Sequence, residues 1–344
     1  MRMMLVTDAW KPQVNGVVRT WEQVTSEMRS RGIEVEVVHP GMFRSFAAPR
    51  YPEIKLAVLP GRRVRRMIEE TEADAIHIAT EGPLGMAAVR HCRRRKQRYT
   101  TSYHTRFPEY MKSYFGLPTG VTDMFLRWFH GPAEATLVPT ASMRSELVER
   151  RFDADRLITW CRGVDTDLFR PDVKVALDLP RPIFAYAGRV AVEKNLEAFL
   201  SLDLPGSKMI IGDGPARPTL ERKYPETFFA GYKFGEALAA TYAAADVFVF
   251  PSLTDTFGVV MLEANACGLP VATFPVTGPI DVVIEGRNGC LDADLRQAAL
   301  RALEVDRDGC IEHARSMTWA RCADMVIENL ACDARLSGSS PAPA

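Results

Sequence analysis

Two carboxylates eight positions apart, Asp255 and Glu263, lie in a segment whose pattern predicts a strand, a polar turn and then a helix. The apolar run DVFVFPS is the predicted strand, and the helix is predicted to begin near Phe257 and Gly258. Ligands of open α/β sheets bind beyond the carboxyl ends of the strands. Free backbone amides at a helix N-terminus favour phosphate. We therefore expect the amides near Phe257, Gly258 and Val259 to contact a diphosphate.

The carboxylates themselves suit a ligand that is rich in hydroxyl groups. Asp255, in the turn, is placed to accept hydrogen bonds from sugar hydroxyls, and Glu263, two helical turns further on, could hold a ribose diol. Each residue alone could instead be structural, Asp255 as a helix N-cap and Glu263 as a surface carboxylate. Their spacing, followed by the apolar run CGLPVA, favours the binding role.

Two cations follow another predicted strand, which ends at Gly188 in the sequence AGRVAVEKN. Arg189 offers a forked donor and Lys194 a point charge, a combination that suits a pyrophosphate. Cations placed there would stabilise the charge that a diphosphate leaving group gains during group transfer. A solvated pair near Glu193 and Glu197 is the alternative for these residues.

Strands and helices alternate along the whole chain, which predicts two parallel α/β domains. Residues 1–172 form the predicted first domain and residues 173–316 the second. Residues 317–333 are a predicted C-terminal helix that returns to the first domain, and residues 334–344, rich in Ser, Pro and Ala, are a predicted disordered tail.

Composition narrows the class of protein. The 344 residues are 47% hydrophobic and 25% charged with zero net charge, as in soluble globular proteins. The seven cysteines lack CxxC spacing, which argues against disulfides and zinc and is consistent with the cytoplasm. No apolar run approaches the ~18 residues of a membrane-spanning helix. No GxGxxG follows the first strand, which disfavours a dinucleotide oxidoreductase.

Taken together, these segments resemble family 4 of the retaining glycosyltransferases, which have the GT-B fold of two Rossmann-like domains facing a central cleft. The family's pair of glutamates is matched by Asp255 and Glu263, with Asp in place of the first Glu, and its Arg/Lys pair by Arg189 and Lys194. The resemblance implies that Gly188, Gly212 in IIGDGP and Gly231 in the FAGY segment lie at the donor nucleotide.

The resemblance also assigns residues in the N-terminal half. Gly16, in KPQVNGVVRT, would let the backbone approach the donor phosphate, because glycine has no Cβ. His104, in TSYHTRFPEY, is implied to sit against the donor sugar and to be catalytic with Asp255, Arg189 and Lys194. Nearby Arg106, Glu109 and Tyr110 are candidates for contacting the acceptor.

The implied reaction is retaining transfer by front-face attack, in which the leaving phosphate takes the acceptor's proton. No metal and no cofactor besides the nucleotide-sugar co-substrate are expected. The motif DTD at 165–167 imitates a metal-binding pair of another glycosyltransferase fold, and we interpret Asp165 as structural. No His/Cys/Asp cluster elsewhere in the sequence has metal-ligand spacing.

Arginines cluster in GRRVRR (61–66, with arginines from 62) and RHCRRRKQR (90–98), both in the predicted acceptor-side domain. Such runs attract anionic lipid at ~1 kcal/mol per cation, which suggests a peripheral enzyme at the inner face of the cell membrane. A solvated helix end is the alternative, and nothing accompanies the charges to indicate nucleic-acid binding.

Within the family, the sequence is most similar to bacterial diacylglycerol glycosyltransferases and to GDP-mannose-dependent α-mannosyltransferases. The basic runs favour a membrane glycolipid synthase of the first group, which would use a UDP-glucose or UDP-glucuronate donor and a lipid acceptor such as diacylglycerol. No residue separates UDP from GDP donors. A GDP-mannose-dependent α-mannosyltransferase acting on lipid or polysaccharide is the alternative. A sugar-nucleotide epimerase and a non-catalytic nucleotide-binding partner are more remote, since no acid/base pair is evident and the matched residues occur together.

Overall fold

The computed structural model of the chain describes every residue except 14, 49–50, 107, 109–117, 174 and 333–344. The chain divides into two compact units. Unit 1 comprises Met1–Cys161 together with the described residues from Ala320 onward, and unit 2 comprises Arg162–Trp319. The predicted tail 334–344 lies outside the described residues.

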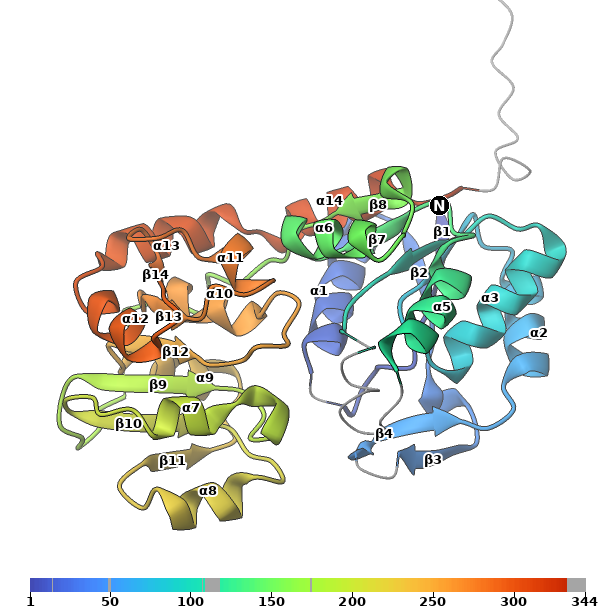
Figure 1. The fold of residues 1–344 in the computed structure, drawn as a ribbon. Helices are drawn as coiled ribbons and strands as arrows, with labels where there is room; N and C mark the ends of the chain where they lie inside the picture. The colour runs from blue at the N-terminus through green and yellow to red at the C-terminus, as the bar shows by residue number, and fades with distance from the viewer. Residues whose placement is uncertain (14, 49–50, 107, 109–117, 174, 333–344) are drawn as a thin grey trace, which may run out of the picture. The chain divides into compact units, whose positions relative to one another are not determined.

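Unit 1 is built on a six-stranded parallel sheet (Figure 1). In spatial order its strands are β2 (Glu34–Val38), β1 (Arg2–Val6), β5 (Ala75–Ile78), β6 (Thr100–Ser102), β7 (Thr136–Val138) and β8 (Leu157–Thr159). Its helices are α1 (Gly16–Ser30), α2 (Gly61–Thr71), α3 (Pro83–Arg95), α5 (Thr119–His130), α6 (Ala141–Glu149) and α14 (Trp319–Glu328). A hairpin of β3 (Ser45–Ala48) and β4 (Tyr51–Ala57) is added to this sheet-and-helix core.

Unit 2 repeats this plan with its own six-stranded parallel sheet. The strands run in the order β11 (Phe228–Gly231), β10 (Ser207–Ile211), β9 (Ile183–Ala187), β12 (Val247–Phe250), β13 (Val271–Thr273) and β14 (Gly289–Leu291). Its helices are α7 (Leu196–Leu200), α8 (Arg217–Lys223), α9 (Gly235–Ala243), α10 (Val259–Ala266), α11 (Pro279–Val282), α12 (Leu295–Ala302) and α13 (Arg307–Ser316).

The strands of unit 2 read as nearly continuous apolar runs because both faces of the sheet are covered by helices. Along β9, Ile183 and Ala185 belong to a core shared with α9 and α10. The alternate residues Phe184 and Tyr186 belong to a second core, shared with α7 and α12. This alternation follows from the two-residue period of a strand. Both units therefore confirm the predicted fold class of two Rossmann-like α/β domains.

The boundary between the units lies earlier in the chain than predicted. Residue 172 is the predicted end of the first domain, whereas the contacts divide the chain after Cys161. The intervening segment packs into unit 2, where Val164 and Phe169 are part of the core. The Val164 amide also donates to the Met317 carbonyl at 3.0 Å. The prolines that follow mark where the next strand begins and not where the contacts change.

Candidate functional site

The structure brings Lys194 and Asp255 together in unit 2. Lys194 Nζ donates to both carboxylate oxygens of Asp255, at 2.7 and 2.8 Å. Lys194 ends the short helix η3 (Val192–Lys194) that follows β9, and Asp255 lies in the loop after β12. Because β9 and β12 are parallel neighbours, their carboxyl ends meet at one edge of the sheet. About a fifth of each side chain is exposed, so solutes can reach the pair.

Two further hydrogen bonds hold these loops against each other. Asn195, at a φ of 53° in the left-handed region, donates from Nδ2 to the Pro251 carbonyl at 3.1 Å. Thr254 Oγ1 donates to the Glu193 carbonyl at 3.4 Å. Two side-chain-to-backbone hydrogen bonds between the loops therefore fix the positions of Lys194 and Asp255, in addition to their own ion pair.

The glycines at the same edge allow three strand ends to approach closely. A Cβ on Gly212 would stand 1.9 Å from the Gly188 carbonyl oxygen, and both residues have a φ of 146°. The Gly212 amide donates to the Gly231 carbonyl at 2.9 Å. Arg189 follows Gly188 directly, and its carbonyl accepts from the Tyr186 hydroxyl at 3.1 Å. Four residues that are predicted to lie at the donor are therefore neighbours at this edge of the sheet: Gly188, Arg189, Gly212 and Gly231.

The predicted phosphate-binding turn leads into α10. Gly258, at a φ of 85°, is the residue before the helix, and Val259 is its first residue. This positive φ favours glycine, and a Cβ here would also press on the Phe250 ring at 3.0 Å and on the flexible end of Met261 at 2.8 Å. Phe257 is buried, and the Arg162 guanidinium lies 5.7 Å from the centre of its ring. The structure therefore places all three predicted residues at a helix N-terminus.

Glu263 is buried in α10, only 2% exposed, so the alternative of a surface carboxylate is wrong. Its Oε2 accepts from the Tyr242 hydroxyl at 3.3 Å. Burial of Cys267, followed by the charge of the nearby Glu263 carboxylate, raises the pKa of the Cys267 thiol to about 12. Buried, perturbed carboxylates occur more often at binding sites than elsewhere in a core.

In unit 1, His104 lies just beyond β6 and is 8% exposed. Its Nε2 accepts from the Trp21 indole at 2.9 Å and lies 2.8 Å from Ser102 Oγ. Of these three residues, only His104 is predicted from the sequence. The Ser-x-His spacing in a strand puts Ser102 on the same face and could have indicated it, whereas Trp21 is 83 positions away.

Arg106, a predicted acceptor contact, is engaged inside unit 1. Its guanidinium forms a short ion pair with Glu146, which also pairs with Arg150 at 2.6 Å. Burial alone would raise the pKa of Glu146, but the hydrogen bonds and charges of the two arginines lower it overall. The other two predicted acceptor residues, Glu109 and Tyr110, lie outside the described residues.

Gly16 is the first residue of α1, and its position leaves room for a ligand. The Asn15 side chain caps the helix by accepting from the amides of Val17 and Val18, both at 3.0 Å. Nothing lies within 4 Å of the place that a Cβ on Gly16 would occupy. The backbone of this loop is therefore open to close approach.

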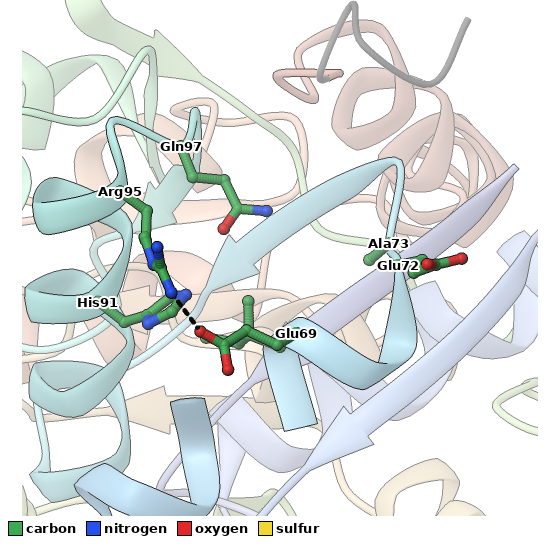
Figure 2. A pocket seen from close by; sticks show the side chains of 7 residues that line it. Glu69, Glu72, Ala73, His91, Arg95 and Gln97 are labelled. Atoms are coloured by element: carbon green, nitrogen blue, oxygen red, sulfur yellow. Dashed lines mark hydrogen bonds and ion pairs between the residues drawn. The ribbon is translucent and has the colours of Figure 1, made fainter. Parts of the chain in front are cut away.

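A pocket of about 340 Å³ lies elsewhere in unit 1, between α2 and α3 (Figure 2). It is lined by Ile68, Glu69, Glu72, Ala73, His91, Arg95 and Gln97. Arg95 pairs with Glu69 at 3.0 Å, and burial lowers the pKa of His91. None of the predicted site residues lines this pocket, so we assign the candidate site to the strand ends described above.

Asp165 has the structural role predicted for it, since its Oδ1 accepts from the amides of Asp167 and Leu168 at 3.1 and 3.0 Å. Among the described residues, no group of three His, Cys, Asp or Glu side chains is arranged to hold a metal ion. In the same part of the chain, no helix has both the length and the apolar character needed to cross a membrane.

Two family models match this chain. The model described as Glycosyltransferase Family 4 matches residues 14–168, and the model described as Glycosyl transferases group 1 matches residues 181–305. Among solved structures, sucrose-phosphate synthase of Thermosynechococcus elongatus has a TM-score of 0.77 at 20% identity, over 95% of this chain and 97% of the other. Anabaena HepE, in complex with UDP, has a TM-score of 0.68 at 14% identity, over 95% and 99%. These two likenesses concern the fold.

Curated relatives are more similar in sequence. A GDP-mannose-dependent alpha-mannosyltransferase of Mycolicibacterium smegmatis is 31% identical over 96% of both chains. One of Corynebacterium glutamicum is 29% identical over 99% of this chain and 91% of the relative. The sulfoquinovosyl transferase SQD2 of Arabidopsis thaliana is 31% identical over 80% of this chain, which spans only 60% of that relative's length. The chain therefore belongs to family 4 of the glycosyltransferases and is itself a glycosyltransferase with the GT-B fold.

Proposed function

We propose that this enzyme transfers a hexosyl group from a nucleotide-diphosphate sugar to an acceptor hydroxyl, with retention of anomeric configuration and without a metal. The observation that carries the proposal is the meeting of Lys194 with Asp255 beside the N-terminus of α10 in unit 2. A cation, a carboxylate and free backbone amides lie at one sheet edge, and together they suit a diphosphate that carries a sugar.

In the proposed reaction, the bond between the anomeric carbon and the diphosphate oxygen breaks, and the acceptor oxygen bonds to the same face of that carbon. The acceptor's proton passes to the leaving phosphate oxygen. Arg189, Lys194 and the amides of Gly258 and Val259 stabilise the charge that develops on the diphosphate, which is a preorganised electrostatic contribution. Asp255 accepts from the sugar hydroxyls, and its ion pair also fixes the direction of the Lys194 ammonium.

The remaining residues are proposed to bind the rest of the donor. Glu263 holds the ribose diol, while the close-packed Gly188, Gly212 and Gly231 leave backbone groups accessible to the nucleotide. In unit 1, Gly16 approaches the phosphate and His104 contacts the sugar. These roles follow from the family resemblance, and the burial of Glu263 and the open space at Gly16 support them.

For the donor we favour GDP-mannose. Three mannosyltransferase relatives named for that donor match over 83% to 96% of their own length. A UDP-sugar donor with a diacylglycerol acceptor is the second candidate, supported by the resemblance to bacterial diacylglycerol glycosyltransferases and by the arginine runs. The two candidates share the proposed diphosphate site and differ at the nucleobase and the acceptor.

A lipid acceptor at an anionic membrane surface is supported by two helices of unit 1 that pack against each other (Figure 1). Exposed arginines follow one face of α2 and the last turns of α3; they are Arg62, Arg63, Arg65, Arg66, Arg90, Arg93, Arg94 and Arg95. Glu69 pairs with Arg95 at 3.0 Å and lies 4.0 Å from Arg65, so it offsets part of this charge. Co-sedimentation with anionic vesicles at low salt is expected, and its absence would contradict the membrane proposal.

The first experiment is isothermal calorimetry of the purified protein with GDP and UDP in excess EDTA, followed by transfer assays with the matching sugar nucleotides. Binding of GDP and incorporation of mannose would support the favoured donor. Binding of UDP would support the second candidate. Loss of all binding and turnover in EDTA, restored by Mg²⁺, would overturn the metal-independent reaction. Binding of neither nucleotide in any condition would overturn the proposed donor site.

A further inference from the structure

A chain of buried hydrogen bonds runs through the sheet of unit 1 and ends at His104. Thr100 Oγ1 lies 2.8 Å from His77 Nδ1, and His77 Nε2 lies 3.2 Å from Ser102 Oγ. Ser102 Oγ in turn lies 2.8 Å from His104 Nε2. The register that pairs His77 with Thr100 explains why these side chains share one face of the sheet. All members of the chain are at least nine-tenths buried.

The Trp21 indole determines the direction of this chain. An indole N–H can only donate, so His104 Nε2, 2.9 Å away, must be an acceptor without a proton. At 2.8 Å from this nitrogen, the Ser102 hydroxyl must donate to it, so the two donors share one lone pair; the Ala79 carbonyl, at 3.4 Å, is a more distant acceptor for the same hydroxyl. Ser102 then accepts from the Nε2–H of His77. His77 Nδ1 accordingly accepts from the Thr100 hydroxyl. In this arrangement each N–H and O–H of the chain points to an acceptor. In the reverse direction His104 would carry a proton on Nε2 and donate to Ser102, and that N–H would face the indole N–H of Trp21.

His77 is suited to a fixed role because it stays neutral. It is fully buried, and burial, followed by the charge of His130, lowers its pKa to about 3. The ring centres of Trp21 and His77 lie 4.6 Å apart, and those of Trp160 and His104 lie 5.9 Å apart. Both histidines of the chain therefore pack against buried tryptophans, where a misdirected hydrogen bond would be costly.

We propose that Trp21, Ser102 and His77 are positioning residues that hold His104 as the neutral tautomer with its proton on Nδ1. This inference rests on the proposed function, in which His104 contacts the donor sugar. In this tautomer the second ring nitrogen is a hydrogen-bond donor, so it would donate to a sugar or phosphate oxygen without adding a full positive charge. The other common tautomer would turn an acceptor toward that oxygen.

The tautomer is tested by ¹⁵N NMR of the histidine ring nitrogens in the protein without substrate, since protonated and unprotonated ring nitrogens differ widely in chemical shift. Trp21→Phe removes the indole N–H that excludes a proton from His104 Nε2. We expect the His104 signals to move from the Nδ1–H form toward the Nε2–H form. Trp160→Phe is the matched control, because it removes an equally buried indole in ring contact with His104 and should leave the tautomer unchanged.

Catalysis is tested with adjacent residues of β6. Ser102→Ala removes the hydroxyl beside His104, whereas Thr101→Val removes an equally buried hydroxyl bonded to Thr136 and His130. Losing a preorganised donor costs ~10²–10³ in kcat, so we expect Ser102→Ala to lower kcat at least ~10-fold with KM little changed. Ser102→Thr, which restores the hydroxyl, should recover most of the rate, and Thr101→Val should keep it.

An Nε2–H signal for His104 in the unmodified protein would overturn the proposal, as would equal rate losses in Ser102→Ala and Thr101→Val. The NMR measurement needs no substrate. A protein with the expected tautomer but no transfer from any sugar nucleotide would therefore refute the proposed function and leave the tautomer assignment intact.

Discussion

At the scale of single residues, the Lys194 ammonium is the strongest test of the proposed diphosphate site. Lys194→Ala removes one preorganised cation, and we expect kcat to fall by ~10²–10³. Lys223→Ala is the control, because Lys223 pairs with Glu197 in an exposed ion pair of the same unit. Steady-state assays compare the two variants. Equal activity of Lys194→Ala and the unmodified enzyme would remove Lys194 from the site.

Glu263 makes a second prediction at this scale. Glu263→Gln keeps the shape of the buried side chain but removes the charge that would hold the ribose diol. A hydrogen bond to a charged group contributes ~1.5–3 kcal/mol, so the Kd for the nucleotide should rise about 10- to 100-fold. Calorimetry against the exposed control Glu197→Gln measures this change. An unaltered Kd with intact folding would contradict the ribose role.

The residues of the candidate site could be predicted in part. The cations and carboxylates of unit 2 follow recognisable strands, and their residue types alone indicate diphosphate chemistry. The ion pair between Lys194 and Asp255 could not be predicted, because 61 positions separate them and only the strand order brings them together. The Trp21 contact with His104 was missed for the same reason, since a helical tryptophan at an apolar position reads as ordinary core.

At the scale of elements, Asp8 ties the loop after β1 to the N-terminus of α3. Its carboxylate accepts from the amides of Leu84 and Gly85 at 2.9 and 3.2 Å. Burial raises the pKa of Asp8 from 3.8 to about 6, although these hydrogen bonds act in the opposite direction. The folded protein therefore holds a proton between pH 4 and 6 that the unfolded chain has lost, so stability should fall as pH rises through this range.

The size of this effect is on the order of 3 kcal/mol, from about two units of pKa. Asp8→Asn cannot titrate, and its free energy of unfolding should lack this decline. His77, with its lowered pKa, contributes the opposite slope from pH 3 to 6.5 in both proteins and cancels in the difference. Urea unfolding at pH 4, 5, 6 and 7 measures that difference. A constant difference across this range would show that the Asp8 pKa is not raised.

Elements with strong apolar periodicity can be predicted from the sequence, as in α3 (Pro83–Arg95), where Leu84, Ala88 and Cys92 are buried at intervals of four residues. Helix α2 was not predicted, because Val64, Ile68 and Thr71 are its buried residues and arginines dominate the rest. Its basic run suggests a solvated helix end, whereas it forms the exposed face of a complete helix. The hairpin of β3 and β4 was also missed, since its sequence lacks a strong alternation of apolar and polar residues.

At the scale of the whole molecule, unit 1 is completed by the last described part of the chain. Cys322, Ala323 and Val326 of α14 are buried. Arg31 of α1 forms an ion pair with Asp324 and donates to the Ala320 carbonyl at 2.9 Å. The chain thus leaves unit 1 after Cys161 and returns to it at Ala320, so the stability of unit 1 depends on residues synthesised after unit 2.

Val326→Asp tests this dependence by burying an unpaired charge in α14. We expect it to lower the free energy of unfolding of unit 1 by more than ~3 kcal/mol, while unit 2 keeps its stability. Hydrogen exchange, read separately for β1 and β9, measures both units in one experiment. Glu328→Ala, on the exposed side of the same helix, should change neither. Unaltered protection of β1 in Val326→Asp would show that unit 1 is stable without α14.

The Asn15–Gly16 step also has a consequence for the ageing of the purified enzyme. Asn15 is exposed, and among the described residues its side chain is held only by the helix cap to Val17 and Val18 and by a 3.3 Å hydrogen bond to Gln13. When the cap opens, the Gly16 nitrogen can attack the asparagine side chain and release ammonia. The other Asn-Gly step, Asn288–Gly289, is protected, because Asn288 is buried and its Nδ2 donates to Asn265 and Val282. Deamidation at Asn15 would replace a helix cap by a negatively charged, lengthened backbone at the loop proposed to face phosphate. Stored protein should therefore lose donor affinity before it loses its fold.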